Sequence, residues 1–404
     1  MPDPEEHFWG RGRLLFSAQP SGLRKVGWPM NNQSTFSKTH QLHKWLYSDA
    51  LPLWASRGID PNGTGAYEAL SHRGDPLSDL PRRVRIHPRQ SFVFARAAKN
   101  GNPQYLRLAE DLFRFTMDRC FEPETGLLAA ETLPDGSISK VSHELYDLAF
   151  ILLAAAALLE HGLDIQDDLT RLKASLAGLK AQTGWFENVS CSIPRRQNPH
   201  MHLFEATTEL ASVTNDRDWQ YISEECLNMF RNIFLQPKGL VFENFDAKWR
   251  PPTFGQRLEP GHIAEWIWLL DRYEKKSGDD SGVDLEAMFQ QILSARQTGG
   301  LLRDSLRPNA RTSRLWPQTE FLKAVVCLNR RGSVYCAIDP DFIVGRIFDD
   351  YLKTEIEGGW YDCRSEDGRL LSHNMPSSSF YHLFTAFSEY LEDAQQHEEL
   401  ACDT

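Results

Sequence analysis

The feature that most constrains the fold of this chain is an alternation between two kinds of predicted helix. In Pro103–Phe121, apolar residues at helical spacing are interleaved with Arg, Glu and Asp, which indicates one solvated face. Ser142–Gly162 is apolar almost all round, and such a helix must be covered by neighbours on every side. Outer helices that enclose inner ones satisfy both patterns. Apolar periodicity and helix start and stop signals predict twelve helices, at Gln33–Arg57, Val84–Lys99, Pro103–Phe121, Ser142–Gly162, Ile165–Ala181, Pro199–Thr214, Arg217–Leu235, Pro260–Lys276, Leu285–Arg296, Trp316–Asn329, Asp339–Thr354 and Ser378–Glu392.

Unusual polar or aromatic residues recur near the start of every second predicted helix. Their intervals of about 54 to 66 residues are typical of a closed ring of helical hairpins. If all inner helices run the same way, their N-termini meet at one end of the ring, and these side chains line one cavity that favours developing negative charge. The recurring residues are Arg89, Tyr146, His202, His262, Trp316 and His382.

The pattern predicts an all-α protein in which residues 1–404 form one domain without an internal linker. We expect an N-terminal tail at about residues 1–30 and a C-terminal tail at about residues 394–404. Short segments between the helices, such as T-G-L-L-A-A-E-T-L-P-D-G-S and K-G-L-V-F-E-N-F-D, predict small local β-hairpins.

Composition excludes several classes of function. A formal net charge of -11 disfavours nucleic-acid binding, which needs clustered Lys and Arg. The N-terminus lacks a signal-peptide pattern, and the longest apolar run, Leu148–Leu159, is too short to cross a bilayer. The 7 cysteines show no C-x-x-C spacing, which indicates free thiols in a reducing compartment. We therefore expect a cytoplasmic protein that contacts neither nucleic acid nor membrane.

His262 lies in the first turn of the helix that Pro260-Gly261 is predicted to begin. The positive end of the helix dipole disfavours an extra proton on the ring, so we expect a neutral histidine. Glu265 follows at i+3, and we expect it to reach the ring. A base beside a carboxylate suits proton transfer, whereas the structural alternative is a histidine that caps the helix.

The same His-x-x-Glu spacing recurs at His202 and Glu205, shortly after Asn198-Pro199, a favourable N-cap and first-turn pair. The alternative for His202 is packing in the core. Paired His and Glu at helical spacing also build metal sites, but usually in the order Glu-x-x-His. Because neither H-E-x-x-H nor a cysteine cluster occurs, we expect no metal and favour general acid–base chemistry.

The remaining recurring residues suit binding and proton transfer. His382 lies about one turn into the last helix, after serines that offer an N-cap. Arg89 is costly to bury unless it meets a carboxylate or an oxygen-rich ligand. Trp316 can stack on a sugar ring and Tyr146 offers a hydroxyl, although both residue types are also common in protein cores.

Seven motifs together resemble the N-acylglucosamine 2-epimerase superfamily, and its D-mannose isomerase branch in particular. They follow the family's order and span almost the whole chain, which implies an (α/α)6 barrel with the sugar in its mouth. One departure is Ala264, where family members often carry a larger apolar residue. The motifs are G-A-Y-E-A-L (65–70), R-Q-S-F-V-F-A (89–95), L-Y-D-L-A-F (145–150), R-R-Q-N-P-H-M-H-L-F-E-A (195–206), E-P-G-H-I-A-E-W (259–266), R-L-W-P-Q-T-E (314–320) and S-F-Y-H-L (379–383).

The resemblance also implies a reaction on the open-chain sugar without a cofactor. A base removes the C2 proton and gives a cis-enediol; a proton returned to C1 makes the ketose, and one returned to the opposite face of C2 makes the epimer. Histidine suits this transfer, because its unperturbed pKa is ~6.5. By resemblance, the catalytic residues are His262 and His382, and the residues that bind or orient the sugar are Arg89, Tyr146, Asn198, His202, Arg257, Glu265 and Trp316.

We therefore expect an aldose–ketose isomerase that interconverts D-mannose and D-fructose, and also D-lyxose and D-xylulose. His382 is the expected C2–C1 base and His262 the group that assists ring opening, although the two roles can be exchanged. The alternatives are a 2-epimerase of N-acyl hexosamine, mannose/glucose or cellobiose-type sugars, a non-catalytic sugar or protein binder, and a glycoside hydrolase, whose carboxylate pair would come from Glu68, Asp147 and Glu205. No phosphate-cradling glycine loop occurs, which favours an unphosphorylated sugar. We expect a monomer or homodimer.

Overall fold

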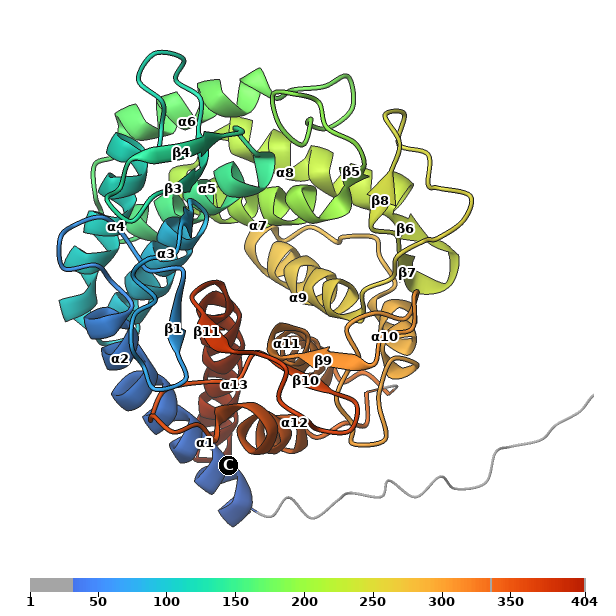
Figure 1. The fold of residues 1–404 in the computed structure, drawn as a ribbon. Helices are drawn as coiled ribbons and strands as arrows, with labels where there is room; N and C mark the ends of the chain where they lie inside the picture. Colours follow the sequence, from blue (N-terminus) through green and yellow to red (C-terminus); the bar gives the residue numbers. More distant parts are fainter. Residues whose placement is uncertain (1–31, 335, 403–404) are drawn as a thin grey trace, which may run out of the picture.

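The inner helices form a closed ring (Figure 1). The structure is a computed structural model that describes residues 32–334 and 336–402. Each inner helix contacts the next, and the last contacts the first. The inner helices are α3 (Ile86–Lys99), α5 (Leu145–Leu159), α7 (Gln197–Thr214), α9 (Pro260–Ser277), α11 (Leu315–Arg330) and α13 (Ser378–Cys402).

A second layer of helices surrounds this ring, so the predicted (α/α)6 barrel is confirmed (Figure 1). The first outer helix is continuous from Asn32 to Arg57, because the π-helical turn Lys44–Ala50 joins α1 (Asn32–His43) to α2 (Leu51–Arg57). The other outer helices are α4 (Leu106–Arg119), α6 (Gln166–Gly178), α8 (Arg217–Met229), α10 (Leu285–Leu293) and α12 (Pro340–Ile347), and short 3-10 or π turns lie at Pro103–Tyr105, Phe230–Phe234, Pro237–Gly239 and Phe348–Leu352.

Burial explains why the two kinds of helix alternate. In α5, Leu148 to Leu158 are all buried, as the all-round apolar pattern predicted. In α4, the apolar side is buried, including Leu112 and Phe113, while Arg107 and Asp111 pair on the outer surface. Each fully buried large apolar side chain contributes about 1.5–3 kcal/mol relative to exposure. The inner helices are therefore held mainly by apolar packing on all sides.

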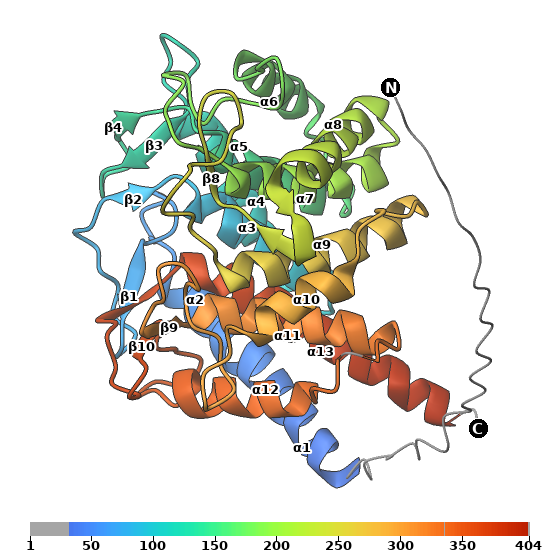
Figure 2. The same ribbon diagram turned by 90° about the vertical axis from the view of Figure 1, so that its right-hand side faces the viewer.

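Short strands gather at the end of the barrel where the inner helices begin (Figure 2). A local hairpin forms where the segment T-G-L-L-A-A-E-T-L-P-D-G-S (125–137) predicted one, but it extends further: β3 lies within the segment and pairs with β4, which begins directly after it. The hairpin predicted within K-G-L-V-F-E-N-F-D is wrong, because β7 pairs with β6 whereas β8 pairs with the distant β5. The strands are β1 (Ala69–Ser71), β2 (Arg82–Arg83), β3 (Ala129–Thr132), β4 (Ile138–Val141), β5 (Arg195–Arg196), β6 (Leu235–Gln236), β7 (Leu240–Val241), β8 (Asn244–Phe245), β9 (Thr312–Arg314), β10 (Cys363–Ser365) and β11 (Asn374–Pro376).

Strand pairing between distant segments helps to close the ring. β1, near the beginning of the described chain, pairs antiparallel with β11, just before α13. Gln90 Nε2 also donates to the Ser377 carbonyl oxygen at 2.8 Å, which fixes the start of α3 against the start of α13. These contacts bring the first and last inner helices into register.

The last helix is longer than predicted. The sequence analysis ended it at Glu392 and placed a tail at about residues 394–404, but α13 continues to Cys402. The added segment contains Ala, Gln, Glu and Leu, which favour helix, and neither Gly nor Pro to stop it. The predicted tail at residues 1–30 lies outside the described residues. Within the described part, no helix is long and apolar enough to span a membrane.

The far end of the barrel holds a buried network of ion pairs. Glu209, which is buried, accepts hydrogen bonds at 2.7 Å from both Arg96 and Arg272 and lies 3.1 Å from Lys276 Nζ. Burial alone would raise the pKa of Glu209, but the three cations outweigh it and hold the pKa below its usual value. The stabilisation is therefore present above the unfolded-state pKa of ~4.3 and is lost as pH falls below it.

We expect Glu209→Ala to lower the free energy of unfolding by about 3 kcal/mol, because it leaves three half-buried cations without their shared buried anion. Urea denaturation at pH 7 measures this change. The control is Asp111→Ala, which breaks the exposed Arg107–Asp111 pair and should cost less than about 1 kcal/mol. Equal losses in the two variants would contradict the role assigned to the network.

Candidate active site

A cavity of about 480 Å³ opens among the first turns of the inner helices. Side chains from all six inner helices or from the strands before them line it. The structure brings into this one cavity all nine residues that the sequence analysis predicted for the site: Arg89, Tyr146, Asn198, His202, Arg257, His262, Glu265, Trp316 and His382.

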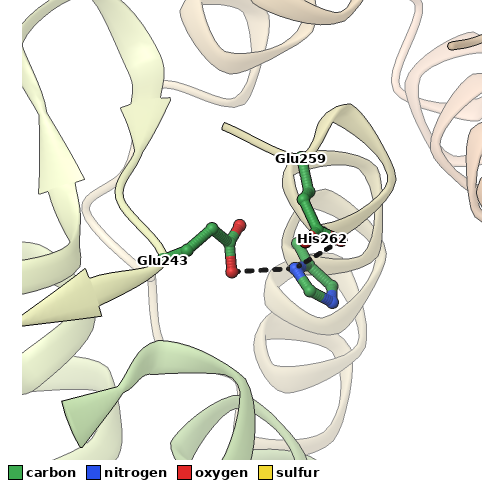
Figure 3. Close-up of side chains that lie close together, drawn as sticks. All are labelled: Glu243, Glu259 and His262. Carbon is green, nitrogen blue, oxygen red and sulfur yellow. Dashed lines mark hydrogen bonds and ion pairs between the residues drawn. The ribbon is translucent and has the colours of Figure 1, made fainter. Parts of the chain in front are cut away.

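Two carboxylates surround His262 (Figure 3). Nδ1 of the ring lies 2.9 Å from Glu243 Oε2 and 3.7 Å from Glu259 Oε2. The prediction that Glu265 contacts this ring is wrong: Glu265 Oε1 lies 4.0 Å from His202 Nε2 instead. Helical side chains lean toward the N-terminus of their helix, so a residue in the first turn reaches the preceding loop rather than the next turn.

These carboxylates also reverse the predicted protonation of His262. Burial alone would lower its pKa, but Glu243 and Glu259 together raise the pKa to about 9. The ring is therefore cationic near neutral pH, whereas the helix dipole had suggested a neutral one. The Nε2 of His262 lies 2.8 Å from the side-chain amide of Asn198, and the Asn198 Oδ1 has no hydrogen-bond partner among the described residues. If the oxygen and nitrogen of this amide exchange places, Oδ1 becomes the acceptor that a cationic ring requires at Nε2.

His382 has the opposite electrostatic environment. Its Nδ1 lies 2.7 Å from Glu320 Oε1, and Glu320 Oε2 lies 2.7 Å from Lys323 Nζ. Burial, followed by the positive charges of Arg89 and Lys323, lowers the pKa of His382 well below its usual value. A neutral ring that donates from Nδ1 to Glu320 keeps an unprotonated Nε2, which is the form of a base.

Trp316 lies against both histidines. Its ring centroid is 5.0 Å from that of His262 and 5.6 Å from that of His382. This position depends on Gly261, because a Cβ at that residue would lie 2.6 Å from the Trp316 ring. The indole therefore fixes the spacing between the acidic and the basic imidazole.

His202 belongs to a third buried group. His202 contacts the glutamate of its His-x-x-Glu motif, because its Nδ1 lies 3.1 Å from Glu205 Oε2. Glu205 also accepts a hydrogen bond from the Tyr381 hydroxyl. Burial lowers the pKa of His202 to about 4 despite the nearby Glu205 carboxylate, so the ring is neutral. Burial, with Glu320 nearby, raises the pKa of Glu265 well above its usual value.

Arg89 extends into the cavity from α3. Its Nη2 donates to the Tyr146 hydroxyl at 2.6 Å, and its guanidinium lies 3.9 Å from the Phe150 ring centroid. Its Nε has no hydrogen-bond partner within the described chain, although the side chain is buried. Arg257, at the rim, pairs with Glu259. A buried guanidinium that lines the cavity fits an oxygen-rich ligand.

Two groups of side chains have the ligand types that a metal ion requires. They are Glu243, Glu259 and His262, and Glu265, Glu320 and His382, with ligand atoms within 4.8 Å of one another in each group. Lys323 already supplies a cation to the second group at 2.7 Å from Glu320. In the first group, Arg257 pairs with Glu259, and Gln197 donates to Glu243 at 3.0 Å. Lys323 and Arg257 place a cation beside one carboxylate of each group, which opposes a metal ion there and favours proton transfer, while Glu243 Oε1 and Glu265 Oε1 have no hydrogen-bond partner among the described residues.

The sequence analysis did not identify the partners that set these charges. Glu243 lies in a segment predicted only to form a hairpin, and Glu320 was quoted in a motif without a role. Lys323, at i+3 from Glu320 inside the otherwise apolar stretch F-L-K-A-V-V, was the available signal, since a buried charge requires a partner. Tyr381 gave no signal beyond its neighbour His382.

We expect Glu243→Gln to lower the pKa of His262 from about 9, because it removes the closer carboxylate and leaves the burial that disfavours the cation. An NMR titration of the imidazole resonances measures this pKa. In the wild type, the raised pKa contributes stability that is complete below pH ~6.5 and is lost as pH rises through about 9. An unchanged pKa in the variant would contradict the charge assigned to His262.

Comparisons with known proteins agree with this architecture. A family model described as N-acylglucosamine 2-epimerase (GlcNAc 2-epimerase) matches residues 65–386. The chain is 30% identical over 377 residues to a mannose-6-phosphate isomerase of Rhizobium meliloti, covering 87% of this chain and 96% of that protein. It is 25% identical over 321 residues to the D-mannose isomerase of Thermobifida fusca, covering 71% and 78%.

A solved structure shows the same fold. The cellobiose 2-epimerase from Spirochaeta thermophila superposes with a TM-score of 0.79 at 21% identity, covering 91% of this chain and 99% of that one. At this identity the likeness concerns the fold alone, whereas the family model covers most of the chain and includes every residue of the predicted site. The chain belongs to the N-acylglucosamine 2-epimerase family of sugar isomerases and epimerases.

Proposed function

We propose that this protein is an aldose–ketose isomerase that interconverts D-mannose and D-fructose, and also D-lyxose and D-xylulose, within a single domain. One observation carries the proposal: a cationic histidine and a neutral histidine contact the same indole in one cavity. Such a pair can remove a proton from carbon and deliver another to oxygen at the same pH. The isomerases from Rhizobium meliloti and Thermobifida fusca support a reaction of this type.

In the proposed reaction, neutral His382 is the base. Its Nε2 takes the C2 proton of the open-chain aldose, and the electrons of the C–H bond form the C1–C2 double bond of an enediolate. Cationic His262 assists ring opening and protonates the developing oxygen. His382 then returns its proton to C1 while the C2 hydroxyl gives its proton to the now neutral His262, so that the C2 carbonyl of the ketose forms and both histidines regain their starting protonation. Arg89 is placed to stabilise the oxygen charge, because its guanidinium lines the same cavity.

A 2-epimerase is the second candidate, since the solved structure that shares the fold carries that activity in its name. Epimerisation requires proton return to the opposite face of C2. His262 is the other histidine in contact with Trp316, and the cation that Glu243 and Glu259 favour is already an acid. It can protonate the opposite face only if the intermediate turns toward it. The single neutral base next to Trp316 therefore favours transfer between C2 and C1.

The glycoside hydrolase alternative has weaker support, because its candidate carboxylates are already engaged. Glu68 bonds to Arg83, Asp147 lies 2.9 Å from Arg85 Nε, and Glu205 bonds to His202. None of the three is among the residues that line the cavity. The charged side chains in the cavity instead support proton transfer by the histidines.

The central test is incubation of the protein with D-mannose in deuterated water and identification of products by NMR. We expect fructose, and a loss of about 10²–10⁴-fold in kcat for His382→Asn, the range typical of a missing general base. His161→Asn is the matched control, since His161 bonds to the Ala95 carbonyl outside the cavity. Inversion at C2 without ketose would replace the isomerase with the epimerase, and full activity of His382→Asn would reject the assigned base.

We further expect Lys323→Met to shift the acid limb of the kcat/KM–pH profile to higher pH. The buried ammonium lowers the pKa of His382 and orients Glu320, so its removal raises the pH at which the base becomes neutral. Lys323→Arg, which keeps the charge, should shift the limb less. Circular dichroism verifies that both variants fold, and an unmoved limb in folded Lys323→Met would contradict this positioning role.

A further inference from the structure

Gln197 and Glu243 face each other because of strand pairing. β5 and β8 pair antiparallel, with Arg196 opposite Asn244. Gln197 directly follows β5 and Glu243 directly precedes β8, so the same ladder places these two residues opposite each other. The Gln197 backbone N–H donates to the Glu243 carbonyl oxygen at 3.2 Å, and its side-chain Nε2 donates to Glu243 Oε2 at 3.0 Å. Gln197 is fully buried and is not among the residues that line the cavity.

A buried indole determines which way the Gln197 amide points. Trp266 Nε1 lies 2.7 Å from Gln197 Oε1. An indole nitrogen can only donate, so the amide oxygen must face Trp266 and the amide nitrogen must face Glu243. Trp266 is itself fully buried and stacks on Phe230, which directly follows outer helix α8, with ring centroids 4.0 Å apart. Packing between the inner and outer helices therefore fixes the orientation of the amide.

These contacts form a closed loop that starts and ends on α9. His262 and Trp266 are four positions apart, about one helical turn, so their side chains lie on the same side of α9. Glu243 Oε2 bonds to both His262 Nδ1 and Gln197 Nε2, and Gln197 returns the chain of hydrogen bonds to α9 at Trp266. Glu243 Oε1 has no hydrogen-bond partner among the described residues. Within the described chain, Gln197 is thus the only side chain besides His262 that hydrogen-bonds to this carboxylate.

We propose that Gln197 is a positioning residue, whose amide holds the Glu243 carboxylate against Nδ1 of His262 and so keeps this histidine in its acid form. Trp266 contributes by fixing the amide. The inference rests on the proposed function, in which His262 is the acid. A carboxylate that accepts an N–H donor stays charged, and a charged carboxylate beside an imidazole favours the imidazolium. Gln197 thus sets the charge of the acid from outside the cavity, without contacting the sugar.

Other charged or titratable groups also surround His262, but none of them bonds to Gln197 within the described chain. They are Glu259 at the N-cap of α9, Arg257 beside Glu259, Glu265 on α9, His202 on α7 and Glu320 on α11. All of them remain when Gln197 is replaced. A change in the protonation of His262 would therefore report on Glu243 alone.

The test is the pKa of His262, measured by NMR titration of the sugar-free protein, with His262→Asn identifying the resonance. We expect Gln197→Met, which removes the amide but keeps the length of the side chain, to lower this pKa by about one pH unit as the carboxylate is released. Trp266→Phe leaves the amide oxygen without its donor and should lower the pKa by less. An unchanged or raised pKa in Gln197→Met would overturn the inference.

Gln197→Glu is the conservative variant. Its carboxyl group still accepts from Trp266, and two carboxyl groups this close share one proton, which restores a donor toward Glu243. We expect the pKa of His262 in this variant to be at least as high as in the wild type. A fall equal to that in Gln197→Met would overturn the positioning role.

Two matched controls separate this role from a general loss of packing. Gln318 is also fully buried near the start of an inner helix, but its amide bonds to backbone and hydroxyl groups and to no carboxylate. Trp268 lies on the same helix as the tryptophan of the loop, but its Nε1 donates to Glu389 at 2.9 Å. We expect Gln318→Met and Trp268→Phe to lower the melting temperature and to leave the pKa of His262 unchanged.

Kinetics separate this inference from the proposed function. In an active isomerase, the alkaline limb of the kcat/KM–pH profile for D-mannose should move to lower pH in Gln197→Met, because the acid loses its proton at lower pH. A purely structural role would slow the reaction equally at every pH, which would overturn the inference while leaving the isomerase intact. If no ketose forms, the proposed function fails, and the NMR titration of the sugar-free protein still supports or overturns the role of Gln197.

Discussion

Packing of α13 against α3 closes the inner ring, and the geometry of the cavity depends on this closure. Arg89 on α3 donates to the Ser378 carbonyl at the start of α13, and Gln90 donates to Ser377. The paired strands β1 and β11 hold the same junction from outside. Because the inner helices then start at one end, the histidines on α7, α9 and α13 reach a common space. An open array of the same helical hairpins would leave them apart.

The closed cavity gives the two histidines different protonation states, because different charged side chains surround them. His262, in the first turn of α9, meets carboxylates from its own N-cap and from the segment before β8. His382, on α13, shares Glu320 with a fully buried lysine. Both rings are desolvated, so the difference comes from the sign of the surrounding charge. A general acid and a general base can then coexist at one pH, each held by a carboxylate on Nδ1.

Arginines paired with carboxylates line the mouth of this site. Arg83 and Arg196, in the strands before α3 and α7, donate from Nε to the loop carboxylates Glu68 and Glu187. The two histidines beside Trp316 lie on inner helices, whereas these arginines lie on the strands that precede inner helices. The cavity is therefore built from helix starts and from the short strands before them.

Much of the fold followed from local patterns. The twelve predicted helical segments agree with those of the structure, and the recurrence of Arg89, Tyr146, His202, His262, Trp316 and His382 correctly predicted one shared cavity. The His202–Glu205 contact was also predictable, because i,i+3 spacing fixes it within one helix. The length of α13 was not predictable, because the polar residues after Glu392 favour a helix but do not show from the sequence alone whether the helix continues.

The sequence by itself determined which inner-helix residues would share one cavity, since helix periodicity and the interval between hairpins are local properties of the chain. Only the tertiary structure decided their charge and partners. Glu243 reaches His262 from 19 positions away, and Glu320 reaches His382 from 62 positions away. Likewise, β5 and β8 are paired although they are distant in the sequence. A pKa depends on every charge and on the burial within a few ångströms, and those neighbours are assembled only when the ring closes.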